Sequence, residues 1–385
     1  MPEDPGSSEI LVYVHVPFCR SKCPYCGFFS LPFTAEAWKV YFQAVLQEID
    51  CLAQEERDST VVSLSFGGGT PSLMPLSAMS KLMDKVFSRF ACSEAMEVTV
   101  EANPDSSSLE AFRALRSLGV NRLSLGLQSL SDADLHFLGR RHSAEQGVRA
   151  AQAAKEAGFD NLNLDLLFGL PGQEALSWVG QLEQALRLEP SHLSCYALTP
   201  EPGTRLLDWI RSGRAQLPED EEQAAMFLHG AAYLNECGFE QYEISNFARS
   251  GYRCRHNLGY WHGFDYLGLG PAAVSFRKGK RRYNPKSLVE FSAGMESGQG
   301  FTSWETLSPG ELANERAMLQ LRLSEGLDLD AYRRQTGRNL LDGHAGFLNQ
   351  LADSGLLGFS RGRIWLTRPG MVVSNAIIAE LFQDC

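Results

Sequence analysis

The chain has 385 residues, of which 44% are hydrophobic and 21% charged; these values are typical of a globular protein, and the length suffices for two or three domains. It contains no apolar run long enough to span a bilayer, and its start, MPEDPGSSEI, lacks the basic and apolar regions of a signal peptide, so we expect a cytoplasmic protein. The net charge of −11 provides no global basic field, which argues against nucleic acid as a partner.

Short β-branched or apolar runs alternate with longer stretches of helical spacing. The predicted strands are 11–16, 61–66, 96–100, 122–127, 162–168 and 192–198. The predicted helices are about 35–54, 76–90, 108–118, 143–157, 174–187 and 219–237. The strands look nearly continuously apolar, which indicates a parallel sheet covered by helices on its outer face. Six such units predict an incomplete or closed α/β barrel, in which an active site lies at the carboxyl ends of the strands.

The pattern of short helices and a hairpin in the C-terminal part of the chain predicts a small separate domain. Its expected elements are helices near 309–323, 328–336 and 343–354, a hairpin within 356–367, and a last helix from about 369 to 382. We therefore predict a barrel over 1–245, a connecting segment over 246–304 and a helical, winged-helix-like domain over 305–385. Such folds often bind nucleic acid, but the stretch from 305 has eight arginines, no lysine and ten acidic residues, so we expect packing or partner contact instead.

Three cysteines follow the first strand directly, in CRSKCPYC. Cys19, Cys23 and Cys26 have the spacing C-x3-C-x2-C, which suits thiolates placed around one side of a cubic iron–sulfur cluster. Full protein ligation would use four cysteines, so one iron would have no protein ligand. Zinc is the alternative, and His15 could then complete a tetrahedron.

Glycine or polar residues follow the next strands. The GGGTP turn at 67–71 would allow backbone to approach a ligand closely and to present N–H groups to it. Glu101, Gln128 and Asp165 end the third, fourth and fifth strands, and Ala197 ends the sixth. Any one of these could be a simple turn or a solvated side chain. Together, beside a cluster with an open iron, they indicate a site for a hydroxylated, amine-bearing ligand.

CRSKCPYC, GGGTP, VEANP, GLQS and LDLLFGLPG resemble the radical S-adenosylmethionine (SAM) superfamily, specifically the oxygen-independent coproporphyrinogen III oxidases and their heme-chaperone relatives. The resemblance covers nearly the whole chain and implies a partial (β/α)6 radical SAM barrel. It also implies a [4Fe–4S] cluster on Cys19, Cys23 and Cys26, with the fourth iron chelated by the amino and carboxylate groups of SAM. A low-potential electron donor would then allow cleavage of the SAM sulfonium to a 5′-deoxyadenosyl radical.

The same resemblance implies which residues contact SAM. The polar or glycine contacts would be Tyr13, Gly68, Gly69, Thr70, Glu101, Gln128, Arg140 and Asp165, with Arg141 as the substitute for Arg140. Ala197 and Val274 would pack against the adenosyl part. These roles suit the residue types, because a carboxylate can bind ribose hydroxyls and a guanidinium can bind a carboxylate.

Two departures separate the chain from the oxidases. The oxidases carry a fourth cysteine where this chain has Phe28, and they have a longer N-terminal extension. HNLGYW at 256–261 instead resembles the HN-x-x-YW signature of the heme-chaperone branch, HemW. The resemblance implies that His256 supplies an axial nitrogen to heme iron while Tyr260 and Trp261 line an apolar face. The alternative is that His256 is a hydrogen-bonded packing residue.

The sequence thus predicts a heme chaperone that binds heme, a [4Fe–4S] cluster and SAM. It would deliver heme to acceptor proteins in the cytoplasm or at the membrane surface. The first alternative is a radical SAM oxidoreductase that decarboxylates coproporphyrinogen III, an activity that the two departures argue against. The second alternative is a zinc-stabilised barrel that only binds partners and would be colourless.

Overall fold

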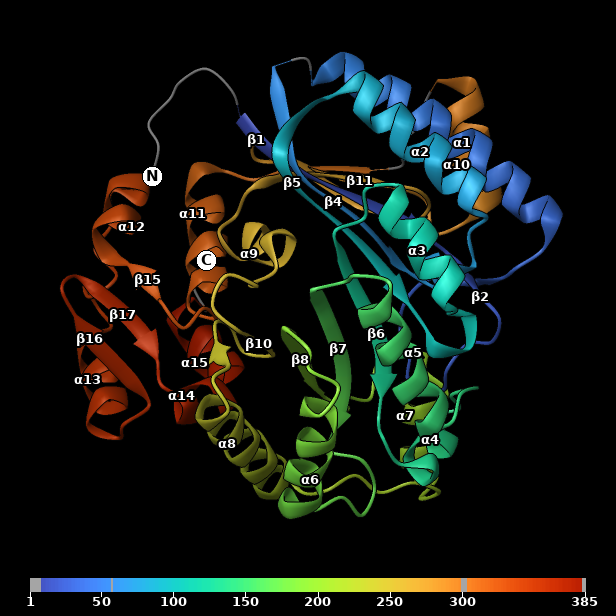
Figure 1. Ribbon diagram of the computed structural model, residues 1–385. Helices are drawn as coiled ribbons and strands as arrows, with labels where there is room; N and C mark the ends of the chain where they lie inside the picture. The colour runs from blue at the N-terminus through green and yellow to red at the C-terminus, as the bar shows by residue number, and fades with distance from the viewer. Residues whose placement is uncertain (1–7, 57, 299–302, 383–385) are drawn as a thin grey trace.

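The computed structural model describes residues 8–56, 58–298 and 303–382. Their main feature is a 12-stranded sheet with the order β14-β13-β12-β11-β1-β4-β5-β6-β7-β8-β10-β9. The sheet curves into an open barrel with helices on its outer face (Figure 1). The fold is α/β with a partial barrel, which confirms the predicted fold class.

Six parallel strands form the centre of this sheet, and they are the six that the sequence predicts. They are β1 (Ser8–Val16), β4 (Ser59–Gly68), β5 (Ala91–Ala102), β6 (Arg122–Gln128), β7 (Asn161–Phe168) and β8 (His192–Ala197). Each pairs in parallel with the next. Because every connection is a crossover, the carboxyl ends of all six strands lie at one end of the barrel. We call this the carboxyl end and the opposite one the amino end.

The crossover helices agree with the predicted ones to within a few residues. They are α1 (Ala35–Glu55), α2 (Leu76–Arg89), α3 (Leu109–Ser117), α5 (Ala144–Glu156), α6 (Ala175–Leu186) and α8 (Asp220–Glu236). Caps explain several starts: the hydroxyls of Thr34, Ser108 and Ser143 each accept the backbone N–H three residues later. The sequence did not predict four short helices, η1 (Pro71–Leu73), η2 (Pro104–Ser106), α4 (Asp132–Phe137) and α7 (Arg205–Arg211). They are too short to show a helical period.

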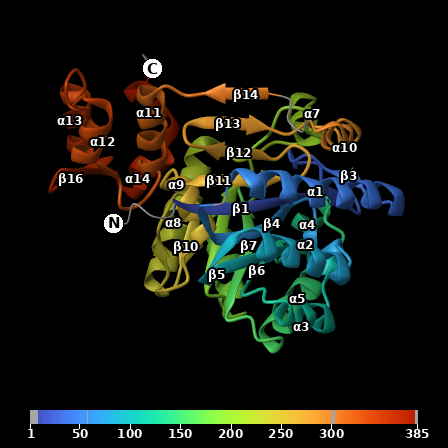
Figure 2. The same cartoon turned by 90° about the horizontal axis from the view of Figure 1, so that it is seen from above.

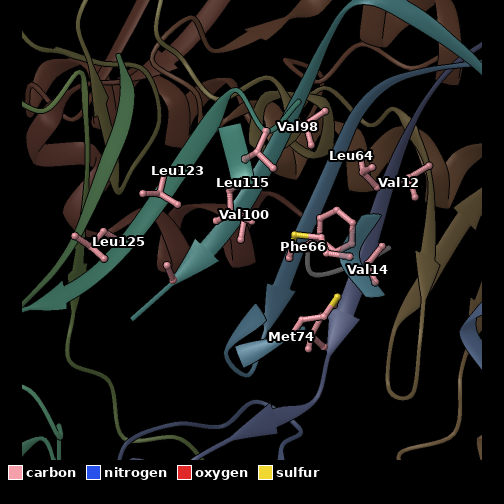
Figure 3. Packing of buried hydrophobic residues seen from close by; sticks show 14 of the residues in the cluster. Val12, Val14, Leu64, Phe66, Met74, Val98, Val100, Leu115, Leu123 and Leu125 are labelled. Carbon is pink, nitrogen blue, oxygen red and sulfur yellow. The ribbon is translucent and has the colours of Figure 1, made fainter. Parts of the chain in front are cut away.

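The central strands alternate between apolar and polar residues, so the expectation of nearly continuous apolar strands was wrong. In β5, Val98 and Val100 are buried in the main core, while Thr99 and Glu101 line a cavity inside the barrel. Figure 3 shows the apolar set, in which Val98, Val100, Leu123 and Leu125 of the sheet lie near Leu115 of α3. Helices cover the apolar face, and the barrel interior is therefore polar.

Residues predicted as a connecting segment contribute strands to both edges of the sheet. β10 (Asn246–Ala248) pairs with β8 on one side and with β9 (Glu240–Gln241) on the other. At the opposite edge, β11 (Asp265–Leu269) pairs in parallel with β1. The strands β12 (Val274–Arg277), β13 (Lys280–Tyr283) and β14 (Ser303–Thr306) then extend that edge (Figure 2). α10 (Leu288–Ser297) packs against α1.

The HNLGYW motif forms the short helix α9 (Arg255–Trp261), which packs against β4, β11 and α11. In Figure 1 it lies inside the curve of the sheet. The buried carboxylate of Glu97, on β5, accepts the backbone N–H groups of Arg255 and His256, each at 3.1 Å, and the thiol of Cys254 at 3.4 Å. Glu97 is the register partner of Ser63, which lies in the first half of β4. Because Glu97 binds the start of α9, this helix lies at the amino end of the barrel and closes it.

The C-terminal unit has its own apolar core and the predicted order of elements. These are α11 (Pro309–Gln320), β15 (Leu327–Asp328), α12 (Leu329–Thr336), α13 (Ala345–Asp353), β16 (Leu357–Ser360), β17 (Arg363–Leu366), α14 (Arg368–Val372) and α15 (Ser374–Leu381). Ser308 caps α11 with Pro309 at its first turn, as predicted. The single predicted last helix was wrong: it is divided at Val373, whose φ of −107° and ψ of 21° are not helical. Consecutive β-branched residues at this point disfavour a continuous helix.

In the described part of the chain, no helix combines the length and the apolar character needed to cross a bilayer.

The close contact between α9 and β1 gives a test of this arrangement. A Cβ atom on Gly259 would lie 2.5 Å from a methyl carbon of Leu11, so Gly259→Ala should force the helix and strand apart. We expect a loss of about 1–3 kcal/mol in the free energy of unfolding, measured by denaturant titration. Gly180→Ala in α6 is the matched control, because a Cβ there meets no atom within 4 Å. That change should stabilise the protein by about 0.5–1 kcal/mol. Equal effects of both changes would contradict the packing described.

Candidate functional site

The cysteine loop, the segment between β2 (Phe18–Cys19) and β3 (Leu31–Pro32), is held at both ends by the pairing of these two strands. Cys19 itself lies on β2. Within the loop, the Phe29 carbonyl accepts a hydrogen bond from His15 Nε2 at 2.9 Å. The segment that carries Cys23 and Cys26 is therefore anchored to β1 and to its own ends.

His15 is not available as a fourth zinc ligand in this structure. Its Nε2 donates to the Phe29 carbonyl, so Nδ1 accepts from the Tyr13 hydroxyl at 3.1 Å. Burial lowers the pKa of His15 and keeps the ring neutral. Among the described residues, no three His, Cys, Asp or Glu side chains converge so as to hold a single metal ion. The zinc alternative gains no support from either observation.

The three thiols lie close enough to influence one another. Burial raises the pKa of Cys19 and of Cys26, and the neighbouring cysteines raise each of them further. Grouped thiolates that do not converge on one point suit a cluster that binds each of them through a different iron. Binding of such a cluster would remove the thiol protons.

A hydrogen-bonded chain connects two of the cysteines across the carboxyl end of the barrel. Arg140 donates through Nη1 to Cys23 Sγ at 3.8 Å and through Nη2 to Asn103 Oδ1 at 2.6 Å. The Asn103 amide donates to Thr70 Oγ1 at 3.0 Å, and the Thr70 hydroxyl donates to Cys19 Sγ at 3.8 Å. Sequence reasoning missed Asn103, although it lies in the VEANP stretch that it used.

Most of the predicted site residues line one cavity of about 410 Å³ inside the barrel. They are Cys19, Cys23, Cys26, Gly68, Gly69, Thr70, Glu101, Gln128, Arg140 and Asp165. Arg141, the substitute for Arg140, lies outside this cavity and pairs with Asp105 at 3.9 Å. The structure thus brings together residues that are more than a hundred positions apart in the sequence.

The glycine turn packs closely against the protein itself. A Cβ on Gly67 would lie 2.7 Å from the Glu101 carboxylate, and one on Gly68 would lie 2.5 Å from the His15 ring. The N–H of Gly68 donates to Glu101, while those of Gly69 and Thr70 donate to backbone carbonyls. The expectation that this turn presents free N–H groups to a ligand was therefore wrong in this conformation. The glycines are needed because side chains and backbone fill the space around them.

A β-bulge at the end of β6 sets the direction of the Gln128 side chain. The pairing register with β7 shifts between Gly126 and Gln128, and Gln128 has a φ of 67°. A non-glycine residue in the left-handed region at a strand end is typical of a functional site, because the bulge redirects the side chain.

Two partly buried carboxyl groups, Glu101 and Asp165, line the cavity. Burial raises the pKa of Glu101 to about 7, and the nearby Asp165 contributes to the rise. Burial also raises the pKa of Asp165, although the hydroxyl of Ser124 and the amide of Asn163 donate to it at 3.0 and 2.7 Å. These acceptors are suited to hydroxyl or amine donors of a bound ligand.

Three of the predicted SAM contacts do not line this cavity. Tyr13 lies just behind the wall, where its ring would meet a Cβ on Gly67 at 2.9 Å. Ala197 is exposed and lines a neighbouring cavity of about 610 Å³. Val274 lies on β12, which β11 separates from β1. The contacts of these residues with SAM remain predictions.

His256 is 4% exposed and lies in the closed amino end of the barrel. Its Nδ1 shares a hydrogen bond with the Ser63 hydroxyl at 2.7 Å, and its Nε2 shares one with the Tyr260 hydroxyl at 3.0 Å. Burial lowers its pKa to about 3, so the ring is neutral. In this conformation neither nitrogen is open to a heme iron, as the packing alternative expects.

Sequence reasoning missed the polar side chains deeper in the cavity. They include Thr99, Arg122, Ser124, Asn163, Ser194 and Asn257. The signal was present in the strict alternation of strands such as RLSLGLQ and NLNLD. When helices cover the apolar face, the polar set of an alternating strand must face the interior.

Residues 13–177 match the Radical SAM superfamily, and residues 307–373 match the HemN C-terminal domain. Over 376 residues the chain is 33% identical to the heme chaperone HemW of Bacillus subtilis, an alignment that spans 97% of this chain and 99% of that protein. The chain belongs to the HemW family. The HemW of Escherichia coli is 40% identical over 273 residues, which are 70% of this chain and 71% of that one.

The HemW fold is also close to that of the solved structure of coproporphyrinogen III oxidase (HemN) from Escherichia coli. The TM-score is 0.84 at 24% identity, and the match covers 98% of this chain and 91% of that one. At this identity the likeness concerns the fold alone.

The raised pKa of Glu101 predicts a pH dependence for this HemW-family protein before a cluster is introduced. The folded-state pKa of Glu101, about 7, exceeds its usual value of 4.5, so the folded state binds the Glu101 proton more tightly than the unfolded state does. Ionisation of Glu101 therefore lowers the free energy of unfolding as the pH rises from about 4.5 to 7. Glu101→Gln should therefore raise the free energy of unfolding above pH 7, by up to about 3 kcal/mol, and have little effect near pH 4.5.

The measurement is denaturant unfolding at several pH values. The difference between variant and parent matters, because Glu48 and Glu243 also have a pKa raised to about 7 and affect both proteins equally. Glu156→Gln, at a carboxyl that is 63% exposed, is the control and should show no such trend. A Glu101→Gln difference independent of pH would contradict the site electrostatics.

Proposed function

We propose that the chain is a heme chaperone that binds a [4Fe–4S] cluster and SAM at the carboxyl end of its barrel and delivers heme to acceptor proteins. One observation carries this proposal: the cysteine loop and the HNLGYW helix line the same cavity. The helix contributes Asn257, and Cys254 directly before the helix also lines the cavity. Membership of the HemW family supports the same function. Delivery would occur in the cytoplasm or at the membrane surface.

Cys19, Cys23 and Cys26 would hold the cluster. All three line the cavity, and two of them accept hydrogen bonds from Thr70 and Arg140, which would stabilise thiolates. When bound, the cluster and SAM supply reductive chemistry that requires a low-potential electron donor. The fit of the donor set supports this assignment.

SAM would bind along the rim formed by Gly68, Gly69 and Thr70, with Glu101, Gln128, Arg140 and Asp165 as its polar contacts. Glu101 and Asp165 can accept from amine and hydroxyl groups, and Arg140 can donate to a carboxylate. Tyr13 would be a further SAM contact, and Ala197 and Val274 would pack against the adenosyl part.

Phe28 supports the chaperone over the oxidase. Its ring is 65% exposed and lines the cavity at the position where the oxidases carry a fourth cysteine. An exposed aromatic ring at the mouth of a cavity favours contact with a flat apolar ligand such as heme.

Heme titration after anaerobic reconstitution with iron and sulfide tests the proposed function. We expect a saturable Soret shift with one heme per chain in the parent protein. If His256 supplies the axial nitrogen, His256→Ala abolishes the shift. Tyr260→Phe should then bind heme at least as well as the parent, because it releases Nε2 from the hydrogen bond with the Tyr260 hydroxyl.

The outcomes separate the alternatives. Heme binding that survives in His256→Ala would assign His256 a packing role and place the ligand elsewhere. Absence of specific heme binding with an intact cluster would contradict the chaperone proposal. Decarboxylation of coproporphyrinogen III by the reconstituted protein under reducing conditions would instead support the oxidase.

A further inference from the structure

The deep part of the cavity contains a buried positive charge with no ion-pair partner. Arg122, the first residue of β6, is 2% exposed and lines the cavity. Its Nη1 donates to Asn161 Oδ1 at 2.6 Å, while its Nε has no partner. Within the described part of the chain, no carboxylate forms an ion pair with it at 4.0 Å or less.

The acidic groups that flank Arg122 have other partners. Glu97 accepts three hydrogen bonds from the segment that begins α9. Asp165 accepts from Ser124 and Asn163. Arg122 lines the cavity, and its Nε–H group has no acceptor among the described residues.

Thr99 offers a second unused donor beside Arg122. The two residues are register partners on adjacent strands, so their side chains point to the same face. Thr99 is 6% exposed, lines the same cavity, and its hydroxyl has no hydrogen-bond partner. Two unsatisfied donors from neighbouring strands thus meet in one buried place.

Such an arrangement is costly unless a ligand completes it. The nearby carboxylates of Glu97 and Asp165 favour the charge of Arg122, but a buried N–H group and a buried hydroxyl without acceptors both destabilise a folded protein. A guanidinium presents its N–H groups as a planar fork that matches a carboxylate, and a hydroxyl can donate to the same group. The Arg122 guanidinium and the Thr99 hydroxyl therefore fit a carboxylate ligand.

We propose that Arg122 and Thr99 form a carboxylate subsite in the deep part of the cavity, and that it binds a propionate group of heme. The inference rests on the proposed function. SAM also has a carboxylate, but that group is expected at the open iron of the cluster. Arg122 lies six residues before Gln128 along β6, a separation of about 20 Å toward the amino end, where the HNLGYW helix is found.

The test compares heme with its dimethyl ester, in which both propionates are neutral, on the reconstituted full-length protein. Arg122→Gln should weaken heme binding about 10- to 100-fold and change binding of the dimethyl ester less than about threefold. Arg113→Gln, at an arginine that is 57% exposed, is the matched control and should change neither. Cluster content and thermal unfolding are measured on every variant.

Thr99→Val keeps the test decisive if Arg122→Gln does not fold. The change is nearly isosteric and removes a hydroxyl with no partner, so it should weaken heme binding several-fold without loss of stability. Equal effects on heme and ester, or no effect on either, would overturn the inference. Weaker SAM binding with unchanged heme binding would assign the subsite to SAM and would also overturn it. If the parent protein itself binds no heme, both the proposed function and the subsite inference fail. If the parent binds heme and the variants bind it equally well, only the subsite inference fails.

Discussion

The buried carboxylate of Glu97 determines how the barrel is closed. By accepting the N–H groups of Arg255 and His256 and the thiol of Cys254, it fixes the start of α9 inside the amino end of the sheet. Gly259 then allows the helix to contact Leu11. The residues at the start of α9 and the cysteine loop near the carboxyl end therefore line the same cavity. The arrangement of the whole site depends on this closure.

The polar interior follows from the same geometry. Helices bury the apolar side of each central strand, so the alternate residues must satisfy one another inside the barrel. Ser124, Asp165, Asn163 and His192 do so in a continuous series of hydrogen bonds that ends at the Tyr242 hydroxyl. Separately, the Tyr242 backbone carbonyl accepts the N–H of Ser324 in the C-terminal unit. Among the described residues that line the cavity, Arg122 Nε and Thr99 Oγ1 are buried without a hydrogen-bond partner, and this is why they point to a ligand.

Much of the fold could be predicted because local signals were strong. Helix caps such as Ser143, the βα alternation and the C-x3-C-x2-C spacing depend on neighbouring residues and are visible in the sequence. Pairing of β11 with β1 depends on contacts across some 250 residues, about which a local pattern says nothing. The deep polar residues were missed for a different reason: alternation was present, but the strands were judged nearly continuously apolar. The hydrogen bonds of His256 could not be predicted either, since Ser63 approaches it only in the folded chain.

The central claim is that one cavity holds the cluster at its mouth and heme deeper inside. The most direct measurement is the distance between the heme iron and the cluster irons in crystals of protein loaded with both, with the irons located by anomalous diffraction at the iron absorption edge. The length of the central strands predicts a separation of no more than about 20 Å. A separation well beyond that value would place heme outside the barrel and contradict the account.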